Sequence, residues 1–269
     1  MKKAIINILI WVLVIIVGAG TVHLLNENNK GKDKNVIIVG YDDTFVPMGF
    51  VNDDGQVVGF DIDLAKAVSE KINKKIEFRS IDWTMKETEL RNGNIDLIWN
   101  GYSVTDERKK QVDFSNPYIS DRQVIIVKSN SDIESKNDFK NKKVGVQAAS
   151  SASDAVMKDT KFIDSLKDGG LIQYQSNNDA LMDLDSGRID GVVSDEVLAR
   201  YYMNKRGKDK YRVLKDDFGS ENFAIGMRKG DKELKNEINR GLQEVISDGT
   251  AESISKKWFG DDIIIKEEK

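Results

Sequence analysis

One short pattern occurs twice in the chain and limits the available folds more than any other feature. Gly93-Asn94-Ile95-Asp96 and Gly187-Arg188-Ile189-Asp190 each follow a segment with helical periodicity and precede a short apolar run, Leu97–Trp99 or Gly191–Val193. Such a glycine-containing tetrapeptide is typical of a turn between a helix and a buried strand. Because polar residues follow both runs, the pattern predicts two units of similar construction, each with polar groups where a strand ends.

The rest of the chain alternates short apolar runs with amphipathic segments. Amphipathic helices are expected at Asp61–Asn73 and Lys232–Ser247. This alternation predicts an α/β fold with mostly parallel sheets, which bind ligands at the carboxyl ends of their strands. The other expected strands are Val36–Val39, Lys75–Arg79, Gln123–Lys128, Lys142–Gln147 and Phe223–Met227.

Composition excludes several classes of function. Of 269 residues, 39% are hydrophobic, enough for two modest lobes with their own cores. The formal net charge of -4, with acids and bases intermixed, argues against a nucleic-acid partner. The chain has no cysteine and one histidine, His23, which rules out a thiol nucleophile, a disulfide, a Cys/His zinc site and a Ser-His-Asp triad in the globular part. No cofactor and no metal site are predicted.

The N-terminus predicts export. Met1-Lys2-Lys3 precedes an apolar run, Ala4–Leu25. As a helix this run would span roughly 33 Å and could cross a bilayer. A membrane anchor at residues 1–25 is therefore expected, with a cleaved signal peptide ending near Val17-Gly18-Ala19-Gly20 as the alternative. Both place the remainder outside the cytoplasm, and the polar stretch at residues 26–35 is predicted to be a linker.

A cation follows the first unit in an unusual position. Thr105 is suited to cap a helix, which puts Arg108 at the third helical residue. A positive charge in the first turn opposes the helix macrodipole, so an anionic partner is a reasonable hypothesis. An ordinary surface arginine remains the alternative.

Other polar and aromatic residues admit similar pairs of interpretations. Asp195 ends the second unit and would either cap the next helix or bind an ammonium group. Ser150 and Ser151 lie in a run of small residues that would cap a helix or approach a ligand. Trp99 is expected in the core, and Trp83 in the wall of a binding site.

Taken together, these segments resemble the polar amino-acid family of solute-binding proteins that serve ABC transporters. The resemblance extends from about Val36 to Phe259. The segments that carry it are Gly40–Pro47, Gly59–Ala65, Thr105–Arg108, Asp113–Tyr118, Gly187–Asp190, Asp248–Thr250 and Lys256–Phe259.

The resemblance implies the type II periplasmic-binding-protein fold, in which two crossing strands join two lobes. The crossings are expected near Gln123–Lys128 and Phe223–Met227. The implied limits are residues 36–122 plus 225–262 for lobe 1, 123–224 for lobe 2, and 263–269 for a C-terminal tail. A monomer is expected.

The resemblance also implies roles for particular residues. Arg108 would bind a ligand carboxylate and Asp195 its ammonium group. The segment Ala149-Ser150-Ser151 stands where the family often has Gly-Thr-Thr, which changes the donors at that position. The further binding residues implied are Ser103, Ser150 and Ser151 beside the carboxylate, Phe45 and Trp83 around the side chain, Asp42 at its polar tip, and Asn100 and Gly101 on the rim.

The function implied is capture of a free polar L-amino acid and its delivery to an ABC permease in the membrane, without chemistry. Glutamine, arginine, lysine, histidine and cystine are candidate ligands. Two alternatives remain: a dehydratase of small carboxylic acids on the same fold, and a ligand-sensing receptor domain. A receptor would need a second membrane span and a signalling module after Phe259, where only Gly260–Lys269 follows.

Overall fold

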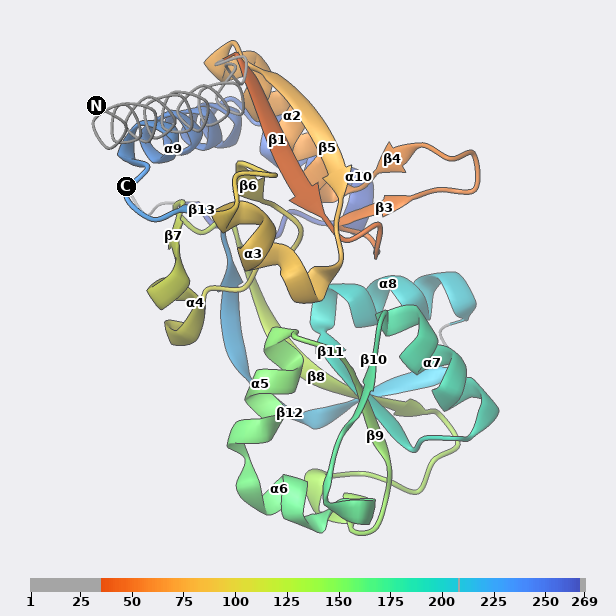
Figure 1. The fold of residues 1–269 in the computed structure, drawn as a ribbon. Helices are drawn as coiled ribbons and strands as arrows, with labels where there is room; N and C mark the ends of the chain where they lie inside the picture. The colour runs from red at the N-terminus through yellow and green to blue at the C-terminus, as the bar shows by residue number, and fades with distance from the viewer. Residues whose placement is uncertain (1–34, 208, 267–269) are drawn as a thin grey trace, which may run out of the picture. The chain divides into compact units, whose positions relative to one another are not determined.

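Two β-sheets organise the computed structural model, which describes residues 35–207 and 209–266 (Figure 1). The chain divides after Val36, and the fold below belongs to the unit Ile37–Lys269. We call the part built on the first sheet lobe 1 and the part built on the second sheet lobe 2. The first sheet has the order β5-β1-β6-β13-β7, with β1 (Val36–Tyr41), β5 (Lys75–Ser80), β6 (Leu97–Ile98), β7 (Val112–Phe114) and β13 (Gly226–Arg228). The second has the order β10-β9-β11-β8-β12, with β8 (Ile119–Lys128), β9 (Val144–Gln147), β10 (Ile172–Tyr174), β11 (Gly191–Asp195) and β12 (Tyr211–Phe223).

Lobe 1 contains the beginning and the end of the described chain. The last two helices return to it, and α9 and α10 pack against α2 (Figure 1). The C-terminal helices thus pack on the first lobe, where the sequence interpretation had placed them. Its helices are α2 (Phe60–Ile72), α3 (Lys86–Arg91), α4 (Asp106–Gln111), α9 (Lys232–Ser247) and α10 (Thr250–Phe259), and β2 (Thr44–Phe45), β3 (Gly49–Val51) and β4 (Val57–Val58) form a small third sheet.

Helices cover both faces of the sheet in lobe 2. Along β8, Val124 and Ile126 belong to the same core as residues of α7 and α8, whereas Ile125 and Val127 belong to a second core with α5 and α6. Burial on both faces explains why this strand is a continuous apolar run rather than an alternating one. The helices of lobe 2 are α5 (Ser151–Lys158), α6 (Thr160–Ser165), α7 (Asn177–Ser186) and α8 (Glu196–Arg206).

The repeated tetrapeptide forms the same structure in both lobes, as predicted. It connects α3 to β6 in lobe 1 and α7 to β11 in lobe 2. Asp96 Oδ2 accepts a hydrogen bond from the backbone N–H of Ile38, on the strand beside β6, at 3.0 Å. Asp190 Oδ2 accepts one from the N–H of Lys143, just before the strand beside β11, at 2.8 Å. Each aspartate thus fixes the start of the neighbouring parallel strand.

Both sheets are mixed, and the expectation of mostly parallel sheets was wrong. The pairs β1–β6, β9–β10 and β9–β11 are parallel, whereas β8 and β13 pair only with antiparallel neighbours. Antiparallel neighbours need no crossover helix. The prediction failed where the chain passes from one sheet to the other.

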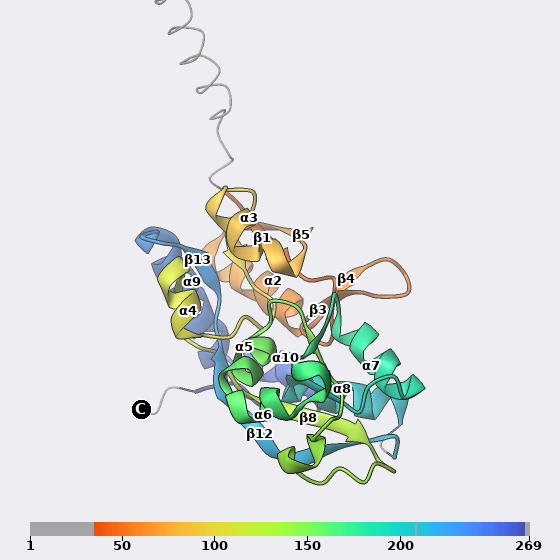
Figure 2. The ribbon, with the colours of Figure 1, turned by 60° about the horizontal axis from the view of Figure 1, so that its bottom comes forward.

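The two strands that connect the lobes are β8 and β12, which pair along most of their length (Figure 1, Figure 2). The second lies earlier in the sequence than expected. Phe223 is the last residue of β12, and Gly226 begins β13 of the other sheet. We call β8 and β12 the hinge strands.

Parts of the predicted organisation fall outside the described residues. The anchor at residues 1–25, nearly all of the linker at 26–35 and the end of the tail at 267–269 lie there. Among the residues that are described, we find no helix with the length and apolar character of a membrane span.

Candidate functional site

Residues from both lobes line one small cavity between the sheets. Arg108 comes from lobe 1 and Asp195 from lobe 2, and both are among its walls. The cavity has a volume of about 10 Å³, the space of roughly one water molecule. The full lining is Phe45, Trp83, Gly101, Arg108, Gln147, Ser150, Ser151 and Asp195.

Arg108 is held by the start of α4. Thr105 caps this helix by accepting a hydrogen bond from the backbone N–H of Arg108 at 3.2 Å, so the predicted cap is confirmed. The guanidinium carbon lies 4.5 Å from the centre of the Tyr102 ring, and Nη1 donates to the carbonyl of Ser103 at 3.1 Å. The side chain is therefore buried and fixed with its charge at the cavity.

Asp195 occupies the matching position in lobe 2, at the end of β11. It immediately precedes α8, but its side chain makes no capping hydrogen bond. Instead its Oδ1 accepts from Nε2 of Gln123 at 2.9 Å. Burial raises the pKa of Asp195 well above its ordinary value, and nearby Glu221 and Asp121 raise it further.

The loop after β9 supplies the rest of the lobe 2 wall. Ser150 caps α5, accepting from the N–H of Ser153 at 3.0 Å, so its capping role is confirmed while Ser151 lines the cavity beside it. Gln147, the last residue of β9, also lines the cavity and was not predicted. A polar residue at the end of an apolar strand is the same signal that pointed to Asp195, and it could have identified Gln147.

The remaining predicted residues lie near the cavity but are not among its walls. Asn100 Oδ1 accepts from the N–H of Asp42 at 2.9 Å and so supports the Asp42 loop. Ser103 Oγ lies 2.8 Å from Ser151 Oγ. Asp42 lines a second, larger pocket, and burial raises its pKa despite hydrogen bonds from Thr44. Trp99 is in the core, as predicted.

Lys86 was missed by the sequence interpretation, although it lies at this site. Its Nζ donates to the carbonyl of Trp83 and to the carbonyl of Ala149, across the lobes, both at 3.0 Å. Burial and the neighbouring Arg108 lower its pKa to about 8. Lys86 is the first residue of α3, so the argument that a cation opposes the macrodipole applied to it as much as to Arg108.

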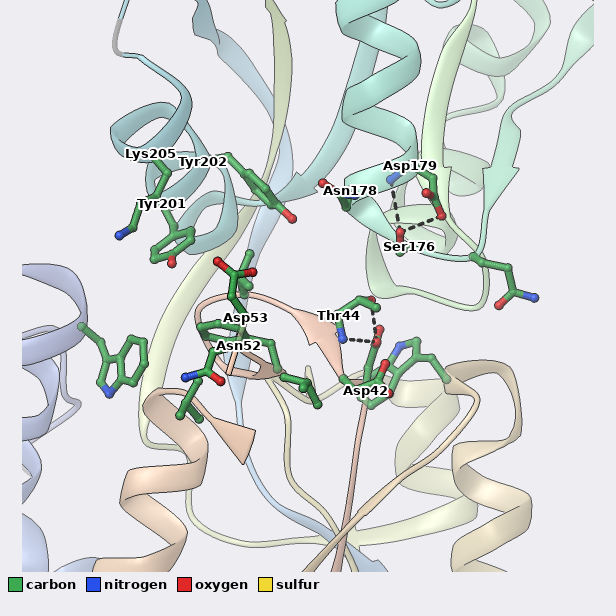
Figure 3. Close-up of a pocket in the computed structure, with 18 of the residues that line it drawn as sticks. Asp42, Thr44, Asn52, Asp53, Ser176, Asn178, Asp179, Tyr201, Tyr202 and Lys205 are labelled. Atoms are coloured by element: carbon green, nitrogen blue, oxygen red, sulfur yellow. Dashed lines mark hydrogen bonds between the residues drawn. The ribbon is translucent and has the colours of Figure 1, made fainter. Parts of the chain in front are cut away.

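A large groove adjoins the small cavity. It has a volume of about 1150 Å³ and shares Trp83 with the cavity. Figure 3 shows Asp42 and Asp53 on one side of the groove, facing Tyr201, Tyr202 and Lys205 from α8 on the other. Nε2 of Gln147 in the cavity wall donates to Oδ2 of Asp42 in the groove wall at 2.6 Å. This hydrogen bond joins the lobes where cavity and groove meet.

Known proteins with the same fold provide the context for this site. The model of the bacterial extracellular solute-binding proteins, family 3, matches residues 37–261. The chain therefore belongs to that family. The L-cystine-binding protein TcyJ of Escherichia coli (strain K12) is 30% identical over 237 residues, which are 87% of this chain and 86% of that protein.

Two solved structures have the same architecture. One is an ABC uptake transporter substrate-binding protein from Streptococcus pneumoniae with bound histidine, 43% identical with a TM-score of 0.84, covering 86% of this chain and 95% of that one. The other is an ancestral amino acid-binding protein described as a precursor of cyclohexadienyl dehydratase, 35% identical with a TM-score of 0.76, covering 84% and 96%. The fold is thus that of a type II periplasmic binding protein.

Proposed function

We propose that this chain is the substrate-binding component of an ABC importer, and that it captures a free polar L-amino acid and delivers it to a membrane permease. The observation that carries the proposal is the placement of Arg108 and Asp195, from different lobes, on one cavity. A zwitterion with its carboxylate on the guanidinium and its ammonium group on the aspartate would bridge the lobes.

The other residues around the cavity have roles consistent with such a ligand. Ser150 and Ser151 provide hydroxyl and backbone donors for the carboxylate at the start of α5, where the helix macrodipole favours an anion. Ser103 supports Arg108 through its carbonyl. Phe45 and Trp83 form an apolar wall for the side chain. Asp42, with Asn100 behind it and Gly101 on the rim, faces the tip of the side chain.

Closure of the lobes is the proposed mechanism of capture. Direct contacts already join them, from Gln147 to Asp42, from Lys86 to the carbonyl of Ala149, and between Ser103 and Ser151. The cavity is far smaller than an ordinary ligand pocket, so an amino acid requires the lobes to separate before it enters. A ligand favours the closed form only through contacts that the open form does not make.

The ligand, the domain limits and the location complete the proposal. A side chain with a donor at its tip suits Asp42, which leaves glutamine, arginine, lysine, histidine and cystine as candidates. The lobe limits stay at residues 36–122 plus 225–262 for lobe 1 and 123–224 for lobe 2. The boundary between residues 122 and 123 falls within β8. The protein would act as a monomer outside the cytoplasm, held at the membrane by residues 1–25.

An enzyme remains the second candidate because one similar structure is described as a precursor of a dehydratase. Asp195 would be the carboxylate available in the cavity wall. The two functions differ in the fate of the amino acid. Incubation with the purified protein should leave it chemically unchanged for a binding protein, and mass spectrometry of the mixture checks this.

A thermal-shift screen against the common amino acids and cystine tests the main proposal. An amino acid present at 100 times its Kd should raise the free energy of unfolding by about 2.7 kcal/mol. One or a few polar amino acids should shift the melting temperature and the remainder should not. A flat response across the whole set would contradict the proposal.

A further inference from the structure

Three carboxyl groups meet beside the cavity, where the hinge strands pass between the lobes. Asp121, Asp195 and Glu221 each have a carboxylate oxygen within 4.8 Å of the other two. Asp121 on β8 is directly opposite Glu221 on β12 in the sheet register. Asp195 ends β11, opposite Gln123 of β8. We call these three residues the hinge carboxylates.

The side-chain and backbone groups that donate hydrogen bonds to them are neutral. Nε2 of Gln123 donates to Asp195 Oδ1 at 2.9 Å and to Glu221 Oε1 at 2.8 Å. Oε1 of Glu221 also accepts from Ser103 Oγ at 2.7 Å, and Asp121 Oδ1 accepts from the N–H of Val197 at 3.2 Å. Within the described part of the chain, Oδ2 of Asp121 is buried without a partner.

The charged groups on the surrounding elements have other partners. Arg122 of β8 is bound by Glu196 at the start of α8, at 2.6 Å, and by Asp217 of β12, at 3.1 Å. Arg108 lines the cavity from lobe 1, where its Nη1 donates to the carbonyl of Ser103 at 3.1 Å and its Nε lies 4.0 Å from Glu87 Oε1. Asp121 and Asp195 are buried and Glu221 is partly buried. Three carboxylates so close together in such a site cannot all be ionised without a cation, because each destabilises the charge of the others.

We propose that the hinge carboxylates form one cation subsite, which holds a proton until the ammonium group of an amino acid replaces it. The inference rests on the proposed function and adds that binding releases a proton. The O–H bond of the protonated carboxyl group in this subsite breaks, its electron pair stays on the carboxylate oxygen, and its proton goes to the solvent. The ammonium group keeps its own protons and donates N–H bonds to the carboxylate that remains.

The close approach of the three carboxyl groups and the raised pKa values of Asp121 and Asp195 both support a bound proton at neutral pH. Burial, together with Glu221, raises the pKa of Asp121 to about 8, and the pKa of Asp195 is raised as well. Because protons leave when the amino acid binds, affinity should increase as pH rises. The increase is up to about tenfold per pH unit for each proton released, over the range from about pH 5 to pH 8 in which Asp121 and Asp195 hold a proton and dissolved amino acids keep their ammonium group.

Isothermal titration calorimetry with L-glutamine and L-arginine tests the inference, because neither side chain titrates in this range. Titrations in two buffers with different ionisation enthalpies give the number of protons released. For the wild type we expect about one proton per bound amino acid. Glu221→Gln should release markedly less and should flatten the dependence of affinity on pH. Asp121→Asn should also release fewer protons and flatten this dependence, while leaving the hydrogen bond from Ser103 to Glu221 in place.

Asp217→Asn is the matched control, a carboxylate on the same hinge strand that is paired with Arg122 and partly exposed. It should release protons as the wild type does. Proton release of zero in the wild type, or equal release by Glu221→Gln, Asp121→Asn and the wild type, would overturn the inference while leaving the proposed function intact. Loss of amino-acid binding in calcium chloride, restored by EDTA, would also overturn it by identifying a metal site. Failure of every amino acid in the thermal screen would overturn the proposed function and this inference with it.

Discussion

The two lobes have the same turn between helix and strand but offer opposite charges after it. In lobe 1 the chain continues from β6 through a loop to α4, where Arg108 is held by Thr105 and Tyr102. In lobe 2 the acid is the last residue of β11 itself. The repeated tetrapeptide fixes each strand, and the residues just beyond it determine the charge. The residues that fix the fold of each unit and the residues that determine its charge are thus adjacent in the sequence but separate.

The lobes also differ in how deeply the aspartate of the turn is buried. The Asp96 side chain is 9% exposed and binds Nη2 of Arg228 at 2.8 Å. The Asp190 side chain is 36% exposed, and Nζ of Lys142 lies 3.7 Å away. The same backbone hydrogen bond is therefore accepted by a buried carboxylate in lobe 1 and by a more exposed one in lobe 2.

The largest effect on binding is expected when the positive charge contributed by lobe 1 is removed. Arg108→Ala should weaken amino-acid binding by roughly 100-fold or more, or about 3 kcal/mol, because it leaves a buried carboxylate of the ligand without its cation. Arg108→Lys should lose less, since it keeps the charge but not the bidentate geometry. Calorimetric titration measures both.

The control for this change is Arg188→Ala. This arginine follows the glycine of the second turn, and its exposed side chain pairs with Asp183 on the surface. Its removal should leave affinity unchanged. If Arg108→Ala bound the amino acid with wild-type affinity, the opposite charges of the two lobes would have no role in binding.

A smaller effect is expected when the aspartates of the turns are removed. Asp96→Ala should lower the free energy of unfolding by about 2 kcal/mol, because it leaves the partly buried N–H of Ile38 and Nη2 of Arg228 without the Asp96 carboxylate. Asp190→Ala should lower it by about 1 kcal/mol, since water replaces part of the lost interaction. Urea unfolding at neutral pH provides the comparison. Equal losses would show that burial does not distinguish the two turns.

The smallest effect should come from the glycines of the turns. Gly93 and Gly187 have φ angles of 77° and 75°. These values lie in the left-handed region, which costs other residues energy. Gly93→Ala and Gly187→Ala should each lower the free energy of unfolding by about 1 kcal/mol. Gly170→Ala, at an extended position with open space around it, should lose nothing. If the losses in the free energy of unfolding of Gly93→Ala and Gly187→Ala differed by more than about 1 kcal/mol, the two turns would not be equivalent.

Much of the fold was predictable because its determinants are local. The turn glycines, the Thr105 cap and the apolar periodicity of the helices each depend on residues a few positions apart. The position of β12 was not predictable, because Lys215, Asp216 and Asp217 interrupt any alternation and the strand shifts register twice along β8. Pairing with a strand far away in sequence determines it.

The same distinction applies to the site. Arg108, Asp195, Ser150 and Ser151 stand at helix starts and strand ends, where sequence rules identify polar groups. Glu221 and Asp121 lie within strands in polar stretches, and their importance comes from a register that joins positions 100 residues apart. No local pattern could have identified them.

Under the proposed function, the hydrogen bond between Gln147 and Asp42 would make binding depend on the length of the ligand side chain. A short side chain confined to the cavity can leave this bond in place. A longer one that extends toward the groove must displace the amide of Gln147 and offer Asp42 a donor of its own. A single carboxylate, that of Asp42 between the cavity and the groove, would then respond both to the length of the ligand side chain and to its ability to donate a hydrogen bond.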